Sequence, residues 1–274
     1  MSMHGDGRYR QQSKASAFAA GTCYRLDGVG DPVVLIHGVG LDQQMWVAQA
    51  EALTPRFKVL RYDLHGHGQS DPLHGEAGLS NFVTQLEALL NSLEISQCAV
   101  IGFSLGALVA RGFARAYPQR ISRLVLMNGV YQRSQEQREA ILSRLETAQQ
   151  QGPAAIIEAA LDRWFSDAYR QSHPQVIQAV CDRLNNNDPQ AFLSAYQIFA
   201  QADQELEGDL LQIQAPTLVM TGELDVGSTP LMAEQMASDL AQASLKIIPG
   251  QRHMMPVEAA QEVNQVLLEF LSRS

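Results

Sequence analysis

The sequence predicts an α/β fold in which helices flank a mostly parallel central sheet. Several short apolar runs, among them residues 32–36 and 97–103, show no alternation of polar and apolar side chains. Continuous apolar runs of this length are typical of strands that are buried on both faces of a parallel sheet. Helical patterns alternate with these runs, and that alternation indicates an α/β architecture.

The first 130 residues contain most of the expected strands and two of the expected helices. Residues 79–93 and 105–117 are expected to be helical, and in the second segment apolar or small side chains recur at the spacing of one helical face. Pro118 ends this second helix, because proline has no amide hydrogen and clashes with the preceding turn. The expected strands are residues 32–36, 57–62, 97–103 and 124–127.

The alternation stops between residues 131 and 208, where the sequence contains no convincing strand. Three prolines, Pro153, Pro174 and Pro189, stand where helices are expected to begin, and Asp188 is a candidate N-cap for the last of these helices. This part of the chain is therefore expected to be entirely helical.

The sheet pattern returns with expected strands at 216–220 and 245–248 and a closing amphipathic helix over 257–271. We therefore expect residues 1–130 and 209–274 to form the α/β core, and residues 131–208 to form a helical cap inserted after the strand at 123–128. Ligands of parallel sheets bind at the carboxyl ends of the strands, so the cap is expected to lie over an active site.

Composition narrows the classes of protein. Hydrophobic residues make up 46% of the chain, charged residues 18%, and the net charge is −9, so a large core is expected and nucleic acid is disfavoured as a partner. The first residues are polar and resemble no signal peptide, and no apolar run is long enough to cross a membrane. Three scattered cysteines, Cys23, Cys98 and Cys181, are expected to be reduced thiols rather than a disulfide framework or a zinc site. A cytoplasmic protein without a membrane partner is therefore expected.

The segment Ile-Gly-Phe-Ser-Leu-Gly at 101–106 lies between an expected strand and an expected helix. In a G-x-S-x-G segment of this kind, a sharp strand-to-helix turn exposes the serine hydroxyl, and small residues on either side allow strand and helix to pack closely. The bare motif also occurs by chance in turns, but the flanking strand and helix favour Ser104 as a nucleophile.

A serine nucleophile needs a histidine base, and a carboxylate must orient that base. Of the seven histidines, His253 lies just past the last expected strand, at the sheet edge where Ser104 is expected. Asp225 follows the strand at 216–220 and is the preferred acid, with Glu223 as the alternative. The other position where an acid can lie, after the strand at 124–127, holds Asn128, which carries no charge. The remaining histidines are His4, His37, His65, His67, His74 and His173.

The chain resembles the α/β-hydrolase superfamily over most of its length. The resemblance is carried by the order Ser104, Asp225, His253 and by two further segments. The segment LIHGVG at 35–40 is similar to its oxyanion-hole loop, and RYDLHGHGQS at 61–70 is similar to another shared segment. The resemblance implies that the backbone N–H groups of Val39 and Leu105 hold the oxyanion. It also implies structural roles for His37 and for several polar and glycine residues of the second segment, namely Asp63, His65, Gly66, His67, Gly68 and Ser70.

Within that superfamily, the chain resembles 3-oxoadipate enol-lactonases and related hydrolases of small acids. The resemblance is carried by LDQQMW at 41–46, by residues 57–71 and 117–129, and by LDRWFSDAYRQSHP at 161–174. The segment LDVGSTP at 224–230 is instead similar to amidohydrolases that cleave acylaminomethylene succinates. The resemblance therefore implies hydrolysis of a small ester or enol-lactone. Amide hydrolysis, carbon–carbon hydrolysis, perhydrolysis and a non-catalytic scaffold are the alternatives.

Substrate selection is expected to depend on the cap. Trp164 and Phe165 are candidates to wall the pocket. Arg133, Arg138 and Arg163 are candidates to bind a substrate carboxylate, because a guanidinium can bind a carboxylate through two hydrogen bonds. A small molecule is thus the expected partner, and an anionic one if these arginines bind its carboxylate. No metal or organic cofactor is expected, since the sequence contains no ligand cluster and no phosphate-binding loop, and it does not predict the oligomeric state.

Overall fold

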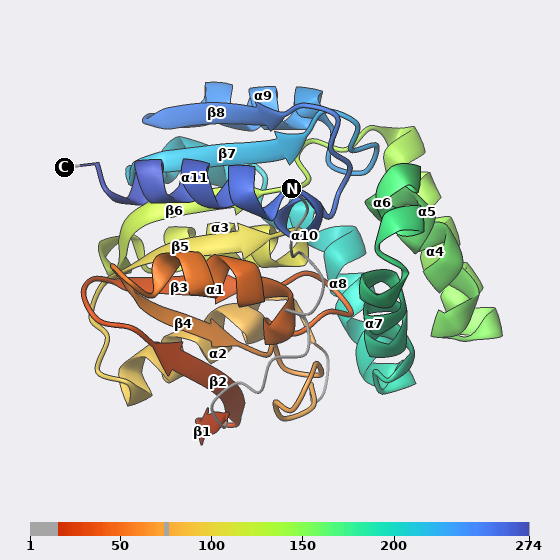
Figure 1. Ribbon diagram of the computed structural model, residues 1–274, viewed down its shortest axis with the longest axis horizontal. Coiled ribbons are helices and arrows are strands. Elements are labelled where there is room, and N and C mark those ends of the chain that lie inside the picture. Colours follow the sequence, from red (N-terminus) through yellow and green to blue (C-terminus); the bar gives the residue numbers. More distant parts are fainter. Residues whose placement is uncertain (1–15, 74–76, 274) are drawn as a thin grey trace, which may run out of the picture.

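A computed structural model describes residues 16–73 and 77–273 (Figure 1). His4 and His74, and the polar N-terminal residues that argued against a signal peptide, lie outside the described residues. The described residues form one sheet of eight strands in the order β1-β2-β4-β3-β5-β6-β7-β8. Every neighbouring pair from β4 to β8 is parallel, whereas β1 and β2 pair antiparallel with each other and β2 pairs antiparallel with β4. The prediction of a mostly parallel α/β sheet is therefore confirmed.

The six predicted strands are present, with ends that differ by a few residues. They are β3 (Pro32–Ile36), β4 (Lys58–Tyr62), β5 (Cys98–Phe103), β6 (Ile121–Met127), β7 (Thr217–Gly222) and β8 (Ala243–Ile248). Two strands, β1 (Ala17–Ala19) and β2 (Thr22–Asp27), were not predicted. They lie at one end of the sheet, where β1 is only three residues long and largely exposed, and β2, with the sequence TCYRLD, is only partly buried and contains no continuous apolar run.

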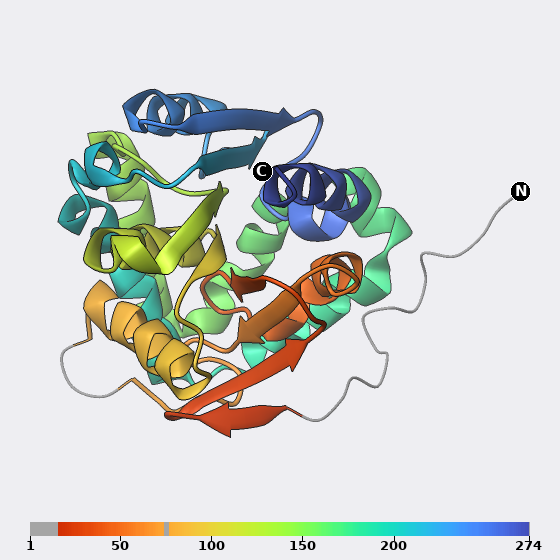
Figure 2. The ribbon, with the colours of Figure 1, turned by 90° about the vertical axis from the view of Figure 1, so that its left-hand side faces the viewer.

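Helices cover both faces of the sheet (Figure 2). One face carries α1 (Val47–Leu53) and α11 (Ala260–Leu271), which pack against each other. The other face carries α2 (Leu79–Ser92), α3 (Leu105–Ala116) and α9 (Pro230–Asp239). The closing helix differs from the prediction, because Ala259 leaves the helical conformation and separates α10 (Met255–Glu258) from α11.

Between β6 and β7 the chain forms helices without a strand, and every residue from 131 to 208 is described. The helices are α4 (Gln135–Gln151), the short 3-10 helix η4 (Pro153–Ile156), α5 (Ile157–Trp164), α6 (Asp167–Ser172), α7 (Pro174–Asn185) and α8 (Pro189–Glu205). Pro174 and Pro189 begin helices as predicted, and the Asp188 side chain caps α8 by accepting a hydrogen bond from the Ala191 N–H at 2.8 Å. Pro153 begins the 3-10 helix rather than an α-helix.

These helices lie beyond the carboxyl ends of the parallel strands (Figure 1). An ion pair of 2.8 Å between Arg183 of α7 and Asp42, which follows β3, joins them to the sheet. A backbone hydrogen bond of 2.9 Å from Met254 to Trp164 joins them to the loop that follows β8. Both contacts lie on the side of the sheet to which the active-site candidates belong.

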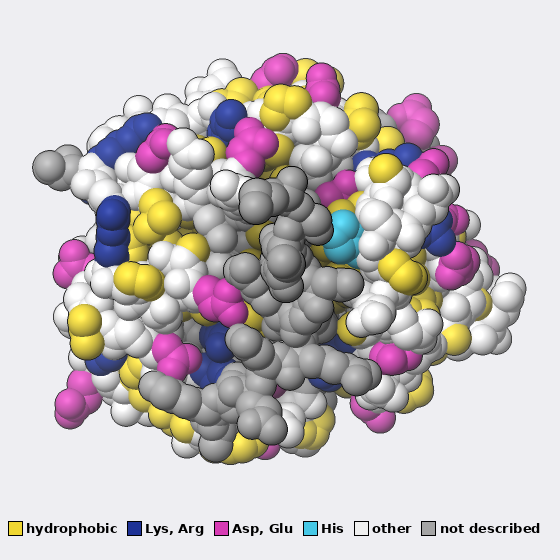
Figure 3. Space-filling model, in the orientation of Figure 1, with side chains coloured by type: hydrophobic (Ala, Val, Ile, Leu, Met, Phe, Trp, Pro, Cys, Tyr) yellow, Lys and Arg dark blue, Asp and Glu magenta, His cyan; other side chains and the backbone are white. Residues whose placement is uncertain are grey.

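Acidic and basic side chains are interspersed over the face shown in Figure 3, and apolar side chains form only small patches between them. Among residues 16–73 and 77–273, no helix combines the length and the apolar character that a membrane crossing requires.

Candidate active site

Ser104 occupies a strained turn between β5 and α3. Its backbone has φ 55° and ψ −113°, a conformation that residues with a side chain rarely adopt. Its N–H donates to the Met127 carbonyl on the neighbouring strand β6 at 2.9 Å, and this bond holds the turn against the sheet. Strain of this kind persists only where the surrounding structure imposes it, and it is concentrated at functional sites.

The two glycines of the motif are required by close backbone contacts. A Cβ atom at Gly102 would lie 2.1 Å from the Gly106 carbonyl oxygen, and one at Gly106 would lie 2.2 Å from the Ile36 carbonyl oxygen. Both contacts are far inside van der Waals distance and involve backbone atoms. The sequence pattern around Ser104 therefore reflects the packing of β5, α3 and β3 against one another.

His253 and Asp225 come from the loops that follow β8 and β7, and they meet at the carboxyl edge of the sheet. Their side chains are joined by a contact of 2.7 Å between His253 Nδ1 and Asp225 Oδ2. Asp225 Oδ1 accepts hydrogen bonds from the N–H groups of Gly227 and Ser228, at 2.9 and 3.0 Å. Glu223, the alternative acid, accepts instead from the Gly250 N–H at 2.8 Å. Of the two acids, the structure places Asp225 on His253.

Asp225 is 4% exposed, and burial by itself raises its pKa. The positive charge of His253 and the hydrogen bonds from His253, Ser228 and Asn128 outweigh burial, and the net result is a lowered pKa. The carboxylate is thus ionised at neutral pH, in the form that can orient an imidazole and stabilise its cation.

Asn128 is a contributor to the site that sequence reasoning missed. It follows β6 with a left-handed backbone, φ 49°, and its Nδ2 donates to Asp225 Oδ2 at 2.9 Å. The Asp225 carboxylate is therefore held by four donors. The signal is present in the sequence, because Asn128 stands where an acid can also lie, and an amide at that position can donate to the acid that takes its place.

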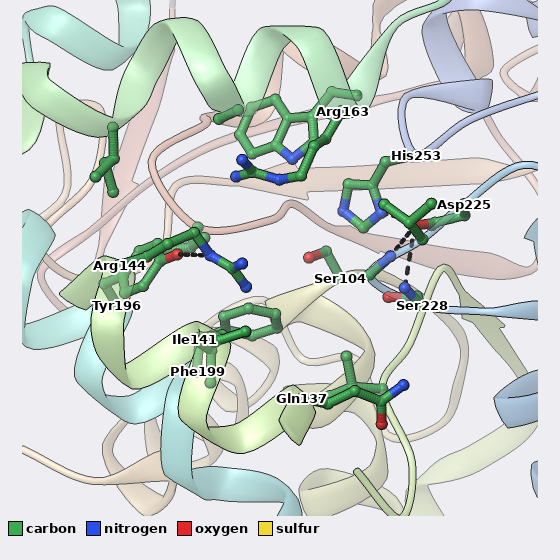
Figure 4. Close-up of a pocket in the computed structure, with 18 of the residues that line it drawn as sticks. Ser104, Gln137, Ile141, Arg144, Arg163, Tyr196, Phe199, Asp225, Ser228 and His253 are labelled. Atoms are coloured by element: carbon green, nitrogen blue, oxygen red, sulfur yellow. Dashed lines mark hydrogen bonds and ion pairs between the residues drawn. The ribbon is translucent and has the colours of Figure 1, made fainter. Parts of the chain in front are cut away.

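A cavity of about 160 Å³ lies between the sheet edge and the helices of residues 131–208 (Figure 4). Ser104, Asp225 and His253 line the same cavity. The Trp164 ring lies 5.9 Å from the His253 ring, measured between centroids. The remaining wall is largely apolar and includes Ile141, Ile156, Leu184, Phe192 and Phe199.

The loop that follows β3 brings Val39 to the cavity wall, and Leu105 begins α3 directly after Ser104. Among the described residues, no acceptor is hydrogen-bonded to the backbone N–H of either residue. His37, by contrast, is fully engaged in the loop: its Nε2 accepts from the Leu64 N–H at 2.9 Å, and its Nδ1 lies 2.8 Å from the Gly38 carbonyl oxygen. Burial lowers the pKa of His37 to about 4, so the ring is neutral and braces the loop.

The residues predicted to contact substrate divide into two groups. Trp164, Arg163 and Arg133 line the cavity. Phe165 does not: it is fully buried and stacks on Tyr169 with ring centroids 5.6 Å apart. Arg138 is also outside the lining.

The charges of Arg133 and Arg138 are both taken up by one carboxylate, that of Asp203, at 2.7 and 3.4 Å. These two guanidinium groups therefore hold α4 and the segment before it against α8. The expectation that they bind a substrate carboxylate finds no support in this arrangement.

The cavity also contains polar residues that the sequence did not single out: Gln137, Arg144, Tyr196 and Ser228. Gln137, Ala140, Ile141 and Arg144 all line it from α4, at the spacing of a single helical face. That spacing is the signal that could have identified Arg144.

In residues 16–73 and 77–273, no group of three or more His, Cys, Asp or Glu side chains is arranged to hold a metal ion. The chemistry that the site can perform with its own residues is nucleophilic: a strained serine, a histidine and a buried carboxylate share one cavity.

Comparison with known proteins identifies the family of the chain. Residues 31–260 match a family model described as the alpha/beta hydrolase fold. An (E)-2-((N-methylformamido)methylene)succinate hydrolase of Acinetobacter baylyi is 33% identical over 90% of this chain and 93% of its own length. A 3-oxoadipate enol-lactonase of the same organism, enol-lactonase 2, is 25% identical over 91% of this chain and 92% of its own length.

Among solved structures, the enol-lactonase from Burkholderia xenovorans LB400 superposes with a TM-score of 0.87 at 28% identity, covering 94% of this chain and all of that one. A thermophilic esterase from Thermogutta terrifontis gives 0.84 at 29% identity, covering 95% of this chain and 98% of that one. The family model covers most of the chain, and the predicted superfamily resemblance is confirmed. The chain belongs to the alpha/beta hydrolase fold family.

Proposed function

We propose that the protein is a serine hydrolase that cleaves a small carboxylic ester or enol-lactone through Ser104, His253 and Asp225. The observation that carries the proposal is the position of Ser104, on a strained turn in the same cavity as a histidine that is bound to a buried carboxylate at 2.7 Å. A serine hydroxyl becomes an effective nucleophile when a histidine held in this way removes its proton.

The proposed reaction proceeds through an acyl-enzyme. His253 Nδ1 is engaged by Asp225, so Nε2 is the nitrogen that accepts the Ser104 proton. Ser104 Oγ attacks the substrate carbonyl, and the resulting oxyanion binds the free N–H groups of Val39 and Leu105. His253 then protonates the leaving oxygen. It next activates a water molecule, which releases the acyl group from Ser104 as a carboxylic acid.

The first test combines labelling with turnover. A fluorophosphonate should attach to Ser104, as identified by mass spectrometry of the modified peptide. Hydrolysis of 3-oxoadipate enol-lactone should proceed with a kcat/KM above roughly 10⁴ M⁻¹s⁻¹. Ser104→Ala should remove the label and lower kcat by several orders of magnitude. Labelling of a different residue, or near-normal turnover by Ser104→Ala, would refute the proposal.

Amide hydrolysis is the second candidate, because the relative named as a hydrolase of a formamido-methylene succinate is 33% identical to this chain and the enol-lactonase is 25% identical. Both reactions use the same serine and differ in the leaving group. Parallel assays with the enol-lactone and with (E)-2-((N-methylformamido)methylene)succinate would separate them. Ser104-dependent turnover of the amide alone would select the amidohydrolase function.

A further inference from the structure

Two arginines reach the cavity from the helices that cover it, Arg144 from α4 and Arg163 from α5. Figure 4 shows their guanidinium groups on one side of the cavity and Asp225 and Ser228 on the other, with Ser104 between them. No carboxylate of residues 16–73 or 77–273 lies within ion-pair distance of either guanidinium. The cavity therefore has one strongly cationic side.

The other arginines of the same helical region are all paired. Arg133 and Arg138 bind Asp203, and Arg183 binds Asp42. Arg170 binds Glu158 and Asp162. The protein thus supplies a carboxylate to each arginine of this region except the two that are free to face a ligand.

This arrangement has an electrostatic cost in the free protein. Arg144 and Arg163 are both partly buried, and burial together with the neighbouring Arg144 charge lowers the pKa of Arg163. Each guanidinium is therefore destabilised by lost hydration, and each repels the other. A bound anion relieves both effects, because it replaces lost hydration with charge-assisted hydrogen bonds and screens the repulsion.

Tyr196 orients one member of the pair. Its hydroxyl accepts a hydrogen bond from Arg144 Nε at 3.3 Å. This bond uses only Nε, so the terminal nitrogens of Arg144 remain available to a ligand. It also restrains the side chain, which therefore loses less conformational freedom when the ligand binds.

We propose that Arg144 and Arg163 together bind a free carboxylate of the substrate, at a distance from the bond that Ser104 attacks. The substrate class is then a short dicarboxylic acid that carries one free carboxylate and one ester, lactone or amide. This inference rests on the proposed function, since Ser104 defines the reacting end. The apolar wall that includes Ile141 and Phe199 suits the short hydrocarbon segment between the two ends.

The test compares two esters that differ only at the far end. Mono-(4-nitrophenyl) adipate ends in a carboxylate, and 4-nitrophenyl hexanoate has a methyl group in its place. Wild-type protein should have the higher kcat/KM for the adipate half-ester. Arg144→Met and Arg163→Met should each lower kcat/KM for the half-ester by roughly 10- to 100-fold and change that for the hexanoate ester by less than about 3-fold.

Arg170→Met is the matched control, because it removes a cation from the same helical region whose charge is already paired and which lies outside the cavity lining. Arg170→Met should leave kcat/KM unchanged for both esters. Loss of activity toward both esters in the Arg144 and Arg163 variants, or a wild-type preference for the hexanoate ester, would overturn the carboxylate site.

Binding separates this inference from the proposed function. Ser104→Ala, which cannot turn over an ester by the proposed route, should bind adipate more tightly than hexanoate in calorimetry, and adding Arg144→Met should remove that preference. Ser104-dependent hydrolysis of both esters without any carboxylate preference would retain the hydrolase and reject the site. Adipate binding that depends on Arg144, in a protein that hydrolyses neither ester, would retain the site and reject the serine hydrolase. Absence of adipate binding would overturn the site in either case.

Discussion

Replacement of Asp225 by asparagine tests how the carboxylate acts on His253. Asp225 Oδ1 accepts from two backbone N–H groups, those of Gly227 and Ser228, at 2.9 and 3.0 Å. Oδ2 accepts from His253 Nδ1 at 2.7 Å and from Asn128 Nδ2 at 2.9 Å. In Asp225→Asn, the single amide oxygen is expected to stay on the two backbone donors, which cannot move independently. The introduced NH₂ group then faces His253.

That NH₂ group is a donor, so His253 Nδ1 must become an acceptor and the ring proton must move to Nε2. A protonated Nε2 cannot remove the Ser104 proton, and the neutral amide no longer stabilises the imidazolium. The same wrong tautomer in a serine protease triad lowers kcat by about 10⁴-fold, which corresponds to about 5.5 kcal/mol. We expect a loss of similar size here.

The fold should tolerate the change. In the wild-type structure, Asn128 Oδ1 is buried without a hydrogen-bond partner among the described residues, so the Asn128 amide can rotate and accept from the introduced NH₂ group. The expected loss of unfolding free energy is therefore only about 1–2 kcal/mol, the value of a perturbed buried hydrogen bond.

The assay measures kcat for wild type, Asp225→Asn and Ser104→Ala with whichever of the two 4-nitrophenyl esters wild type hydrolyses faster. Urea unfolding of each protein is the control for folding. A kcat within tenfold of wild type in Asp225→Asn, at unchanged stability, would refute the tautomer argument. A kcat that falls only in proportion to unfolded protein would show that the carboxylate is structural.

Three further predictions concern packing, pH and a buried charge. Gly106→Ala should lower both turnover and the thermal midpoint, because its Cβ would lie 2.2 Å from the Ile36 carbonyl oxygen; a wild-type value for both would contradict the close contact. Asp42→Asn should change the pH dependence of stability: burial raises the pKa of Asp42 from 3.8 to about 6, so the stability that Asp42 contributes is present below about pH 4 and is lost as the pH rises through 6. Urea unfolding between pH 4 and 7 should show the variant gaining about 3 kcal/mol relative to wild type, and parallel curves would exclude this effect. Asp209→Ala should lower the unfolding free energy by about 3–5 kcal/mol, because it leaves Arg111, which is 1% exposed, without its carboxylate at 2.6 Å; a loss below about 1 kcal/mol would show that the pair is unimportant.

The central sheet and the turn that carries Ser104 were predictable from the amino-acid sequence. Strands buried on both faces must be continuously apolar, so β3, β5 and β7 were predictable, whereas the end strands β1 and β2 meet no such requirement and were missed. The residues around Ser104 were predictable for a similar reason, because close contacts between backbones admit only glycine at Gly102 and Gly106. The pairing of His253 with Asp225 followed from strand order, since the carboxyl ends of parallel strands meet at one edge.

Which arginines of residues 131–208 face the cavity could be learned only from the folded chain. Arg133, Arg138, Arg144 and Arg163 look alike in the sequence, as cations on or beside amphipathic helices. Their roles depend on Asp203 of α8. Asp203 pairs with Arg133 and Arg138, which are more than sixty residues away in the chain, but not with Arg144 or Arg163. A helical pattern specifies which face of a helix is buried, but the charge that meets that face comes from a distant segment. The position of the cationic side of the cavity is therefore a property of how the helices pack.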